Sequence, residues 1–268
     1  MSAIDTLFET LRRTGRKAFM PFITAGFPDL PFTADLLGEL AARGANLCEL
    51  GIPYSDPVAD GPVIQASYTR ALEQNIKLRD ILAMLARVTP KLSIPVVTMV
   101  SYSIVYRHGP EAYVCEAQAA GGAGMIVPDL PVEEAEALAA ICRREDFSLI
   151  QLITPTTPRE RAVRIADSTS GFIYYVSVTG ITGERRELPP DIVDNVAWLR
   201  RQTALPICIG FGISRPEHVR TLAAVADGLI VGSAIVRRIA EAGDKPRSQI
   251  LAEIGDYAAE LISAAEGQ

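Results

Sequence analysis

The chain has 268 residues, of which 49% are hydrophobic, and this is enough apolar surface to fill one large α/β core. A formal net charge of −6, with the basic residues scattered along the chain, argues against a nucleic-acid-binding surface. The sequence contains neither a basic leader followed by an apolar run nor the roughly 18 apolar residues of a membrane span. We therefore expect a cytoplasmic protein with a single domain over residues 1–268.

Short apolar runs alternate with segments that place apolar residues at helical spacing. The runs are continuously apolar, which is typical of parallel strands covered on both faces. Strict alternation predicts right-handed βαβ units, and about 250 residues of them favour a closed (β/α)8 barrel, or TIM barrel. The expected strands are 18–24, 46–50, 95–100, 124–128, 148–153, 172–176, 206–210 and 228–231. The expected helices between them include 29–43, 132–144, 158–167, 190–202 and 216–225.

Two further helices are expected outside this repeat. Near the N-terminus, apolar residues share one helical face, and this extra helix is expected to plug the bottom of the barrel, with partner binding as the alternative. Residues 248–265 form a final amphipathic helix that is expected to pack outside the barrel. The apolar face of the first helix contains Ile4, Leu7, Phe8 and Leu11.

Glycines follow the last three strands, where barrels of this kind often hold phosphate at a helix N-terminus. Each glycine alone could simply make a tight turn. Glycines in three consecutive loops predict a phosphate site in which backbone N–H groups and a helix beginning at Ser233 replace lysine. The glycines concerned are Gly180, Gly183, Gly210, Gly212 and Gly232.

Two carboxylates are the leading catalytic candidates. Glu49 lies inside an apolar run, where it is either a general acid/base with a raised pKa or a member of a structural salt bridge. Asp60 precedes Gly61 in a loop, so it is either functional or a turn-forming and helix-capping residue. Asp129 has the same ambiguity and is more typical of a turn.

Other catalytic apparatus is not apparent in the sequence. The lysines precede strands or lie on helices and surface loops, which does not favour a Schiff base. His108 and His218 are expected on helices, in surface or packing roles, and no metal site is expected. The cysteines occur singly and are expected to be buried thiols. The lysines are Lys17, Lys77, Lys91 and Lys245, and the cysteines are Cys48, Cys115, Cys142 and Cys208.

One long stretch, CELGIPYSDPVADGPVIQ at 48–65, resembles the tryptophan synthase α subunit family. Shorter stretches match the same family in order and spacing, and the resemblance spans nearly the whole chain. It implies a (β/α)8 barrel that cleaves indole-3-glycerol phosphate into indole and glyceraldehyde 3-phosphate. The shorter stretches are MPFITAG at 20–26, VPDLPVEE at 127–134, SVTGITG at 177–183 and GFGIS at 210–214.

The resemblance also implies roles for individual residues. Glu49 matches the family's acid/base, and Asp60 matches the carboxylate that stabilises charge at the indole N–H. Thr182 matches a mobile-loop residue that closes toward Asp60, and flanking glycines are compatible with a hinge. The positions around the indole or the substrate chain are Phe22, Ile64, Tyr174 and Phe211, and those of the phosphate cradle are Gly183, Gly212, Gly232 and Ser233.

A partner is implied in the same way. The family pairs with a β subunit in an α2β2 heterotetramer, and pyridoxal phosphate belongs to that partner, so no cofactor is expected in this chain. Pro53, Asp56 and Pro131 match the docking surface. Ser101 and Ser103 stand where the family usually has tyrosine and asparagine, which changes the contact with the partner. Two other functions remain open: a sugar-phosphate isomerase and a non-catalytic regulatory subunit.

Overall fold

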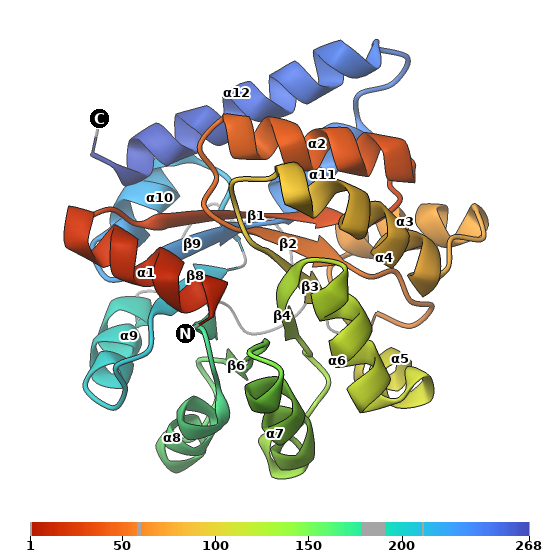
Figure 1. The fold of residues 1–268 in the computed structure, drawn as a ribbon. Coiled ribbons are helices and arrows are strands. Elements are labelled where there is room, and N and C mark those ends of the chain that lie inside the picture. The colour runs from red at the N-terminus through yellow and green to blue at the C-terminus, as the bar shows by residue number, and fades with distance from the viewer. Residues whose placement is uncertain (1, 58–59, 178–190, 211, 268) are drawn as a thin grey trace.

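The computed structural model describes residues 2–57, 60–177, 191–210 and 212–267. Its strands pair in parallel, in the order β5-β4-β3-β2-β1-β9-β8-β7-β6, and helices surround them (Figure 1). The strands are β1 Ala18–Thr24, β2 Cys48–Gly51, β3 Val96–Met99, β4 Gly122–Ile126, β5 Ser148–Ile150, β6 Leu152–Ile153, β7 Ile173–Val176, β8 Ile207–Gly210 and β9 Gly228–Val231.

The two end strands of this sheet are consecutive pieces of one segment. β5 pairs with β4 and β6 pairs with β7, while Gln151 between them accepts a hydrogen bond from the N–H of Tyr174 at 3.1 Å. The sheet therefore closes on itself through residues 148–153. This confirms the (β/α)8 barrel, with one correction: the fifth expected strand is divided, because its two halves bond different neighbours.

The helices lie outside the strands, and every helix expected from the sequence is present. The expected helix 132–144 is interrupted, since a 3₁₀ turn, η2, precedes α7. The helices of the repeat are α2 Leu30–Ala42, α3 Pro62–Glu73, α4 Leu78–Val88, α5 Tyr102–His108, α6 Pro110–Ala119, η2 Val132–Glu134, α7 Glu136–Arg144, α8 Arg159–Ser168, α9 Ile192–Arg200, α10 Pro216–Ala223 and α11 Ser233–Ala240, with a 3₁₀ turn, η1, at Thr89–Lys91.

The extra N-terminal helix, α1 (Ala3–Thr14), covers the amino ends of the strands. Ser2 caps it, accepting from the N–H of Asp5 while the Asp5 carboxylate accepts from the N–H of Ser2. Phe8 is buried, and its ring centroid lies 5.8 Å from that of Phe172, immediately before β7. The apolar face is thus a barrel plug, as expected, and is not available to a partner.

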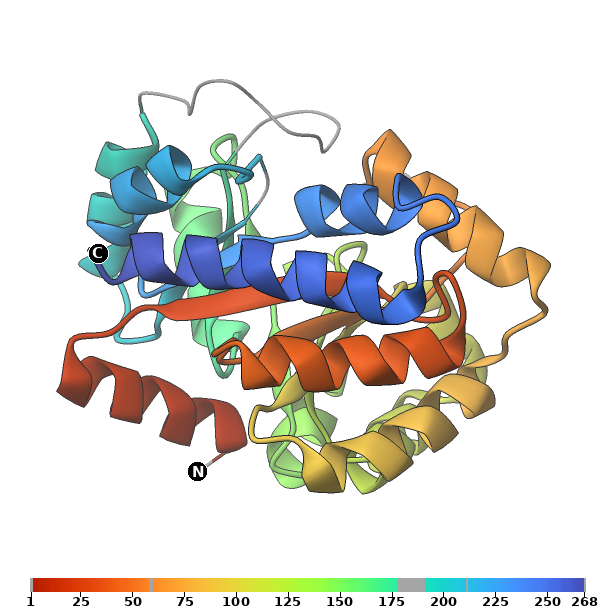
Figure 2. The ribbon, with the colours of Figure 1, turned by 90° about the horizontal axis from the view of Figure 1, so that it is seen from above.

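The last helix, α12 (Arg247–Ala265), lies alongside α2 on the outside of the barrel and also contacts α10 (Figure 2). Its buried residues include Ile254, Ala258 and Leu261, spaced as one helical face. This confirms the structural role expected for it. Among the described residues, no helix combines the length and the apolar character that a membrane crossing requires.

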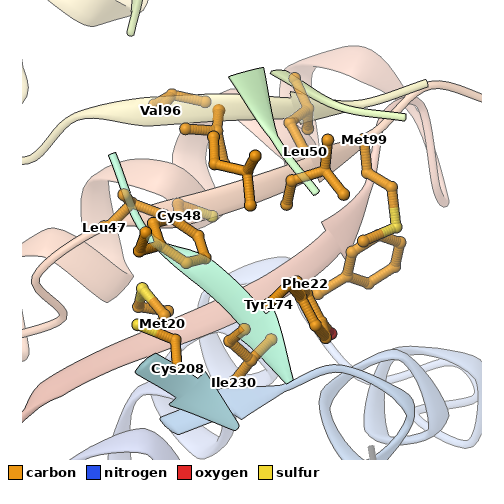
Figure 3. Close-up of a cluster of buried hydrophobic side chains, with 14 of the residues drawn as sticks. Met20, Phe22, Leu47, Cys48, Leu50, Val96, Met99, Tyr174, Cys208 and Ile230 are labelled. Atoms are coloured by element: carbon orange, nitrogen blue, oxygen red, sulfur yellow. The ribbon is translucent and has the colours of Figure 1, made fainter. Parts of the chain in front are cut away.

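Apolar side chains fill the space within the strands. Figure 3 shows Met20, Cys208 and Ile230 gathered there, from three adjacent strands. Cys48 and Cys142 are also buried, as expected. The expectation is wrong for Cys115, which is exposed on α6 because its neighbours Tyr113, Val114 and Ala117 occupy the buried face of that helix.

Candidate active site

A pocket opens at the carboxyl ends of the strands. It brings together residues from β1, β3, β7 and β9, from the loops after β2 and β8, and from the first turns of α3 and α11. Seven residues singled out in the sequence line it, namely Phe22, Asp60, Ile64, Tyr174, Gly212, Gly232 and Ser233. Four others, Gly180, Thr182, Gly183 and Phe211, lie outside the described residues.

Three lining residues, Met99, Ile213 and Ile230, were not singled out in the sequence. Figure 3 shows Met99 toward the same end of the core cluster as Phe22 and Tyr174. An apolar residue at a strand end looks in sequence like any core residue, so nothing marked these three. They make the pocket wall largely apolar, which suits a flat hydrophobic group.

Glu49 lies on β2, in register with Phe22 of β1 and Val97 of β3. Its side chain is fully buried, and neither carboxyl oxygen has a hydrogen-bond partner among the described residues. Burial raises the pKa of Glu49 well above its usual range. Among the described residues no cation pairs with Glu49, which argues against the structural salt bridge, and burial favours the neutral form of the carboxyl.

Asp60 lies in the loop between β2 and α3. The Gln65 side-chain amide donates to the Asp60 carbonyl at 2.8 Å and to the Pro57 carbonyl at 3.2 Å, which braces the loop. Gly61 is the N-cap of α3, so Asp60 does not cap that helix. Burial raises the pKa of Asp60 to about 6. At neutral pH this carboxylate is mostly ionised.

The two carboxyl groups act on the same neighbour. Burial raises the pKa of Tyr174 well above its usual range, and the charges of Glu49 and then Asp60 add to the shift. The Tyr174 hydroxyl lies against β8, because a Cβ at Gly210 would come within 2.3 Å of it. Tyr174 thus connects the buried Glu49 to the pocket, which is lined by Tyr174 and Asp60 but not by Glu49 itself. Two carboxyl groups in different surroundings are typical of acid/base sites.

The part of the pocket lined by Gly212, Gly232 and Ser233 could hold an anion. Helix α11 begins at Ser233, and by the geometry of any α-helix its first N–H groups have no carbonyl partner within the helix. Gly212 has a φ of +77°, in the left-handed region that favours glycine. A Cβ at Gly232 would lie 3.3 Å from the Cβ of Phe22. Small residues therefore let a ligand approach the backbone closely.

Basic side chains are absent from the part of this wall that the structure describes. Lys17 donates to the carbonyl of Ala226, before β9, and Lys245 pairs with Glu253. His218 lies on α10, and the N–H of Ser214 donates to its Nδ1 at 3.5 Å. This histidine has the packing role expected for it, and it secures the loop that follows Gly212.

Comparison with known proteins agrees with this geometry. A family model described as tryptophan synthase alpha chain matches residues 8–265. The chain belongs to that family. It is 59% identical to the tryptophan synthase alpha chain of Rhodopirellula baltica over 92% of this chain and 90% of the relative. For a Synechococcus relative of the same name the identity is 46%, over 99% and 98%.

The solved structures agree as well. Tryptophan synthase subunit alpha from Legionella pneumophila superposes with a TM-score of 0.91 at 34% identity, over 100% of both chains. Tryptophan synthase from Mycobacterium tuberculosis gives a TM-score of 0.90 at 29% identity, over 98% of each chain. Membership of the tryptophan synthase alpha chain family makes this protein a lyase of tryptophan biosynthesis. The isomerase and the non-catalytic subunit are thereby set aside.

A wider groove lies at the same end of the barrel. Pro53 and Asp56, expected at a family docking surface, both line it, together with residues of α5. Pro131 is not among the lining residues; it is the N-cap of η2, two residues after Asp129. The structure therefore brings two of the three expected docking residues into one surface.

The start of α5 is held by Asp129. Its carboxylate accepts from the Ser101 hydroxyl at 2.7 Å and from the N–H of Tyr102 at 2.8 Å. The Ser101 and Ser103 hydroxyls are 2.7 Å apart. Asp129 is thus more than a turn former, because it ties the loop after β4 to the helix after β3. The two serines, which depart from the family pattern, belong to this hydrogen-bonded cluster.

The burial of Glu49 predicts how stability depends on pH. Its pKa is raised in the folded state, so its stabilising contribution is complete below the ordinary value of 4.5 and is lost as pH rises toward the folded pKa. Glu49→Gln cannot titrate. We expect its free energy of unfolding to fall less than that of the wild type between about pH 5 and pH 8, by on the order of 1–3 kcal/mol.

Urea denaturation at both pH values measures this difference. The control is Glu73→Gln, which changes an exposed carboxylate at the end of α3 and should follow the wild type. Asp60 titrates in all three proteins and adds the same decline to each. If the free energies of unfolding of Glu49→Gln and the wild type change in parallel with pH, folding does not raise the pKa of Glu49.

Proposed function

We propose that this chain cleaves indole-3-glycerol phosphate by a retro-aldol reaction, giving indole and glyceraldehyde 3-phosphate, with Glu49 and Asp60 as its catalytic residues. The observation that carries the proposal is the Glu49 carboxyl, which is fully buried without a hydrogen-bond partner among the described residues. Such a group destabilises the fold, and a role in the reaction would explain why it is present. No metal or Schiff base is part of the proposed reaction.

A neutral Glu49 is suited to begin the reaction as an acid. It protonates the indole ring carbon that bears the side chain, and the resulting carboxylate then takes the proton of the adjacent side-chain hydroxyl. The oxygen electrons form the aldehyde carbonyl, and the electrons of the broken carbon–carbon bond restore the aromatic ring. One proton is given and one is taken, so Glu49 ends as it began.

Asp60 has the complementary task. Protonation of the ring carbon places positive charge on the indole nitrogen, and an ionised carboxylate near its N–H stabilises that charge. The pKa of about 6 favours ionised Asp60 at neutral pH, whereas burial favours the protonated form of Glu49. The apolar wall, including Phe22, Ile64 and Tyr174, accepts the ring. Phe211 is assigned there by the family resemblance alone.

The phosphate is assigned to Gly212, Gly232 and Ser233, at the N-terminus of α11. The family resemblance adds Gly183 to this cradle and gives Thr182 the role of a loop residue that closes toward Asp60. The distance between the ends of the pocket is spanned by the glycerol chain of the substrate. Ring, reacting bond and phosphate thus each meet a different group of residues.

Glu49→Gln tests the acid/base role directly. The amide keeps the size of the side chain but cannot exchange a proton, so kcat should fall by about 10²- to 10⁴-fold while substrate still binds. Indole release from indole-3-glycerol phosphate measures the rate, and calorimetry measures binding. A rate within a few-fold of the wild type would remove Glu49 from the chemistry and make Asp60 the first alternative.

Gly232→Asp tests the phosphate assignment. A carboxylate beside the phosphate is repelled, and like-charge contacts at an interface cost several kcal/mol, so affinity for glycerol 3-phosphate should fall by about two orders of magnitude or more. Gly232→Ala is the matched control, because it adds a Cβ near Phe22 without charge. Equal affinities for the two variants in calorimetry would mean that crowding, and not phosphate repulsion, acts at this position.

We also propose that the groove lined by Pro53 and Asp56 docks a tryptophan synthase β subunit, the carrier of pyridoxal phosphate, in an α2β2 complex. Pro131, two residues after Asp129, is assigned to the same contact. Tyr106 on α5 supports this, since 71% of this large side chain is exposed. Indole release with and without the β subunit is the measurement, and an Asp56→Ala chain should respond at least about tenfold more weakly to the partner. An identical response would show that Asp56 is not part of the docking surface.

A further inference from the structure

Tyr68 lies on α3, one helical turn after Ile64, whose side chain lines the pocket. Its side chain is 1% exposed. Its ring centroid is 5.6 Å from that of Tyr54, in the loop that also carries Asp60. Tyr68 therefore packs against the loop that carries Asp60, although it does not itself line the pocket.

The hydroxyl of Tyr68 is buried without a hydrogen-bond partner among the described residues. It is directed at Gly51 on β2, where a Cβ would come within 2.7 Å of the hydroxyl oxygen and within 2.5 Å of Cζ of Phe22. The bare Cα of Gly51 thus makes room for both the Tyr68 hydroxyl and the tip of Phe22. The hydroxyl therefore lies next to Phe22, which lines the pocket, and next to β2. Glu49 lies on the same strand, two residues before Gly51.

The surroundings of this hydroxyl are acidic. Burial raises the pKa of Tyr68 well above its usual range, and Asp60, Tyr54 and Glu49 add to the shift in that order. Tyr174 faces the same two carboxyl groups from β7. Tyr68 is therefore a protonated donor at neutral pH, and Asp60 is the carboxylate with the strongest influence on it.

We propose that Tyr68 is a positioning residue of this site: its hydroxyl donates a hydrogen bond to the Asp60 carboxylate when substrate fills the pocket, and holds that carboxylate toward the indole N–H. The inference rests on the proposed function of Glu49 and Asp60. A phenylalanine would fill the same apolar space without leaving a buried donor unpaired. An unpaired hydroxyl next to Phe22 of the pocket wall, within the electrostatic influence of Asp60 and Glu49, is the kind of feature that persists for function at some cost in stability.

Tyr68→Phe is the test, using the full chain and indole release. Because a hydrogen bond to a charged group is lost only in the substrate complex, kcat should fall about tenfold or more. The lost donor stabilised ionised Asp60, so the acidic limb of the kcat profile should move to higher pH by about one unit. The limb of kcat/KM, which reports the free enzyme, should stay in place.

Thermal unfolding separates this role from a structural one. Removal of an unpaired hydroxyl should leave the midpoint of Tyr68→Phe equal to or above that of the wild type. The matched control is Tyr113→Phe on α6, which is also fully buried but has its hydroxyl 2.9 Å from Oγ1 of Thr98. This control should lose roughly 2–4 °C in midpoint and leave kcat and its pH profile unchanged.

The outcomes distinguish this inference from the function on which it rests. If the wild type releases indole and Tyr68→Phe keeps its rate and its acidic limb, Tyr68 has no positioning role while the lyase function stands. If Tyr68→Phe has a lower kcat and a lower unfolding midpoint, but the acidic limb of its kcat profile is not shifted, the hydroxyl is structural and the inference fails. If the wild type releases no indole at all, the proposed function fails first.

Discussion

The uncompensated burial of the Glu49 carboxyl is the constraint on which the rest of the site depends. A carboxylate in that position would need a cation or several donors, and the described residues supply neither. Burial therefore favours the protonated form of this carboxyl, which is the form that the proposed reaction begins from. The barrel supports this by placing Glu49 on a short strand bonded on both sides, in register with Phe22 and Val97.

Several buried hydroxyl groups elsewhere in the interior are hydrogen-bonded to one another. The hydroxyls of Thr24 and Ser67 lie 2.7 Å apart, and the Thr98 hydroxyl meets a tyrosine at 2.9 Å. Among the described residues, three of the four buried side-chain oxygens without a partner belong to Glu49 and Tyr68. These three oxygens come from β2 and α3, which meet where the Tyr68 hydroxyl faces Gly51. Buried polar groups without partners are rare, and each needs an explanation, which the proposed function gives for Glu49.

An acidic protein that holds a phosphate needs a source of positive potential. The chain carries a net charge of −6, and the described lining of the pocket includes no lysine or arginine. In the proposed function, backbone N–H groups at the start of α11 supply the potential, provided that no side chain intervenes. Gly232 and Gly212 meet that requirement. A phosphate site of this kind would need no cation, and a cation near the carboxyl groups would favour their ionised forms.

The sequence by itself determined the repeat and the barrel, because periodicity and strand order are local signals. A charge inside an apolar run and glycines after the last strands also sufficed to propose the two carboxylates and the end of the barrel for the ligand. It could not show that residues 148–153 form both ends of the sheet or that Cys115 faces outward. Nor could it single out Met99, Ile213 or Ile230. Those properties depend on which strand ends and helix faces meet across the barrel.

Tyr68 shows the same division most clearly. In sequence it is an aromatic residue at helical spacing, indistinguishable from a core position. Only the folded chain brings its hydroxyl to the bare Cα of Gly51, beneath the loop of Asp60. The physical reason is that a hydroxyl becomes a functional group through what surrounds it: burial removes water, and the tertiary structure alone decides whether a partner replaces that water.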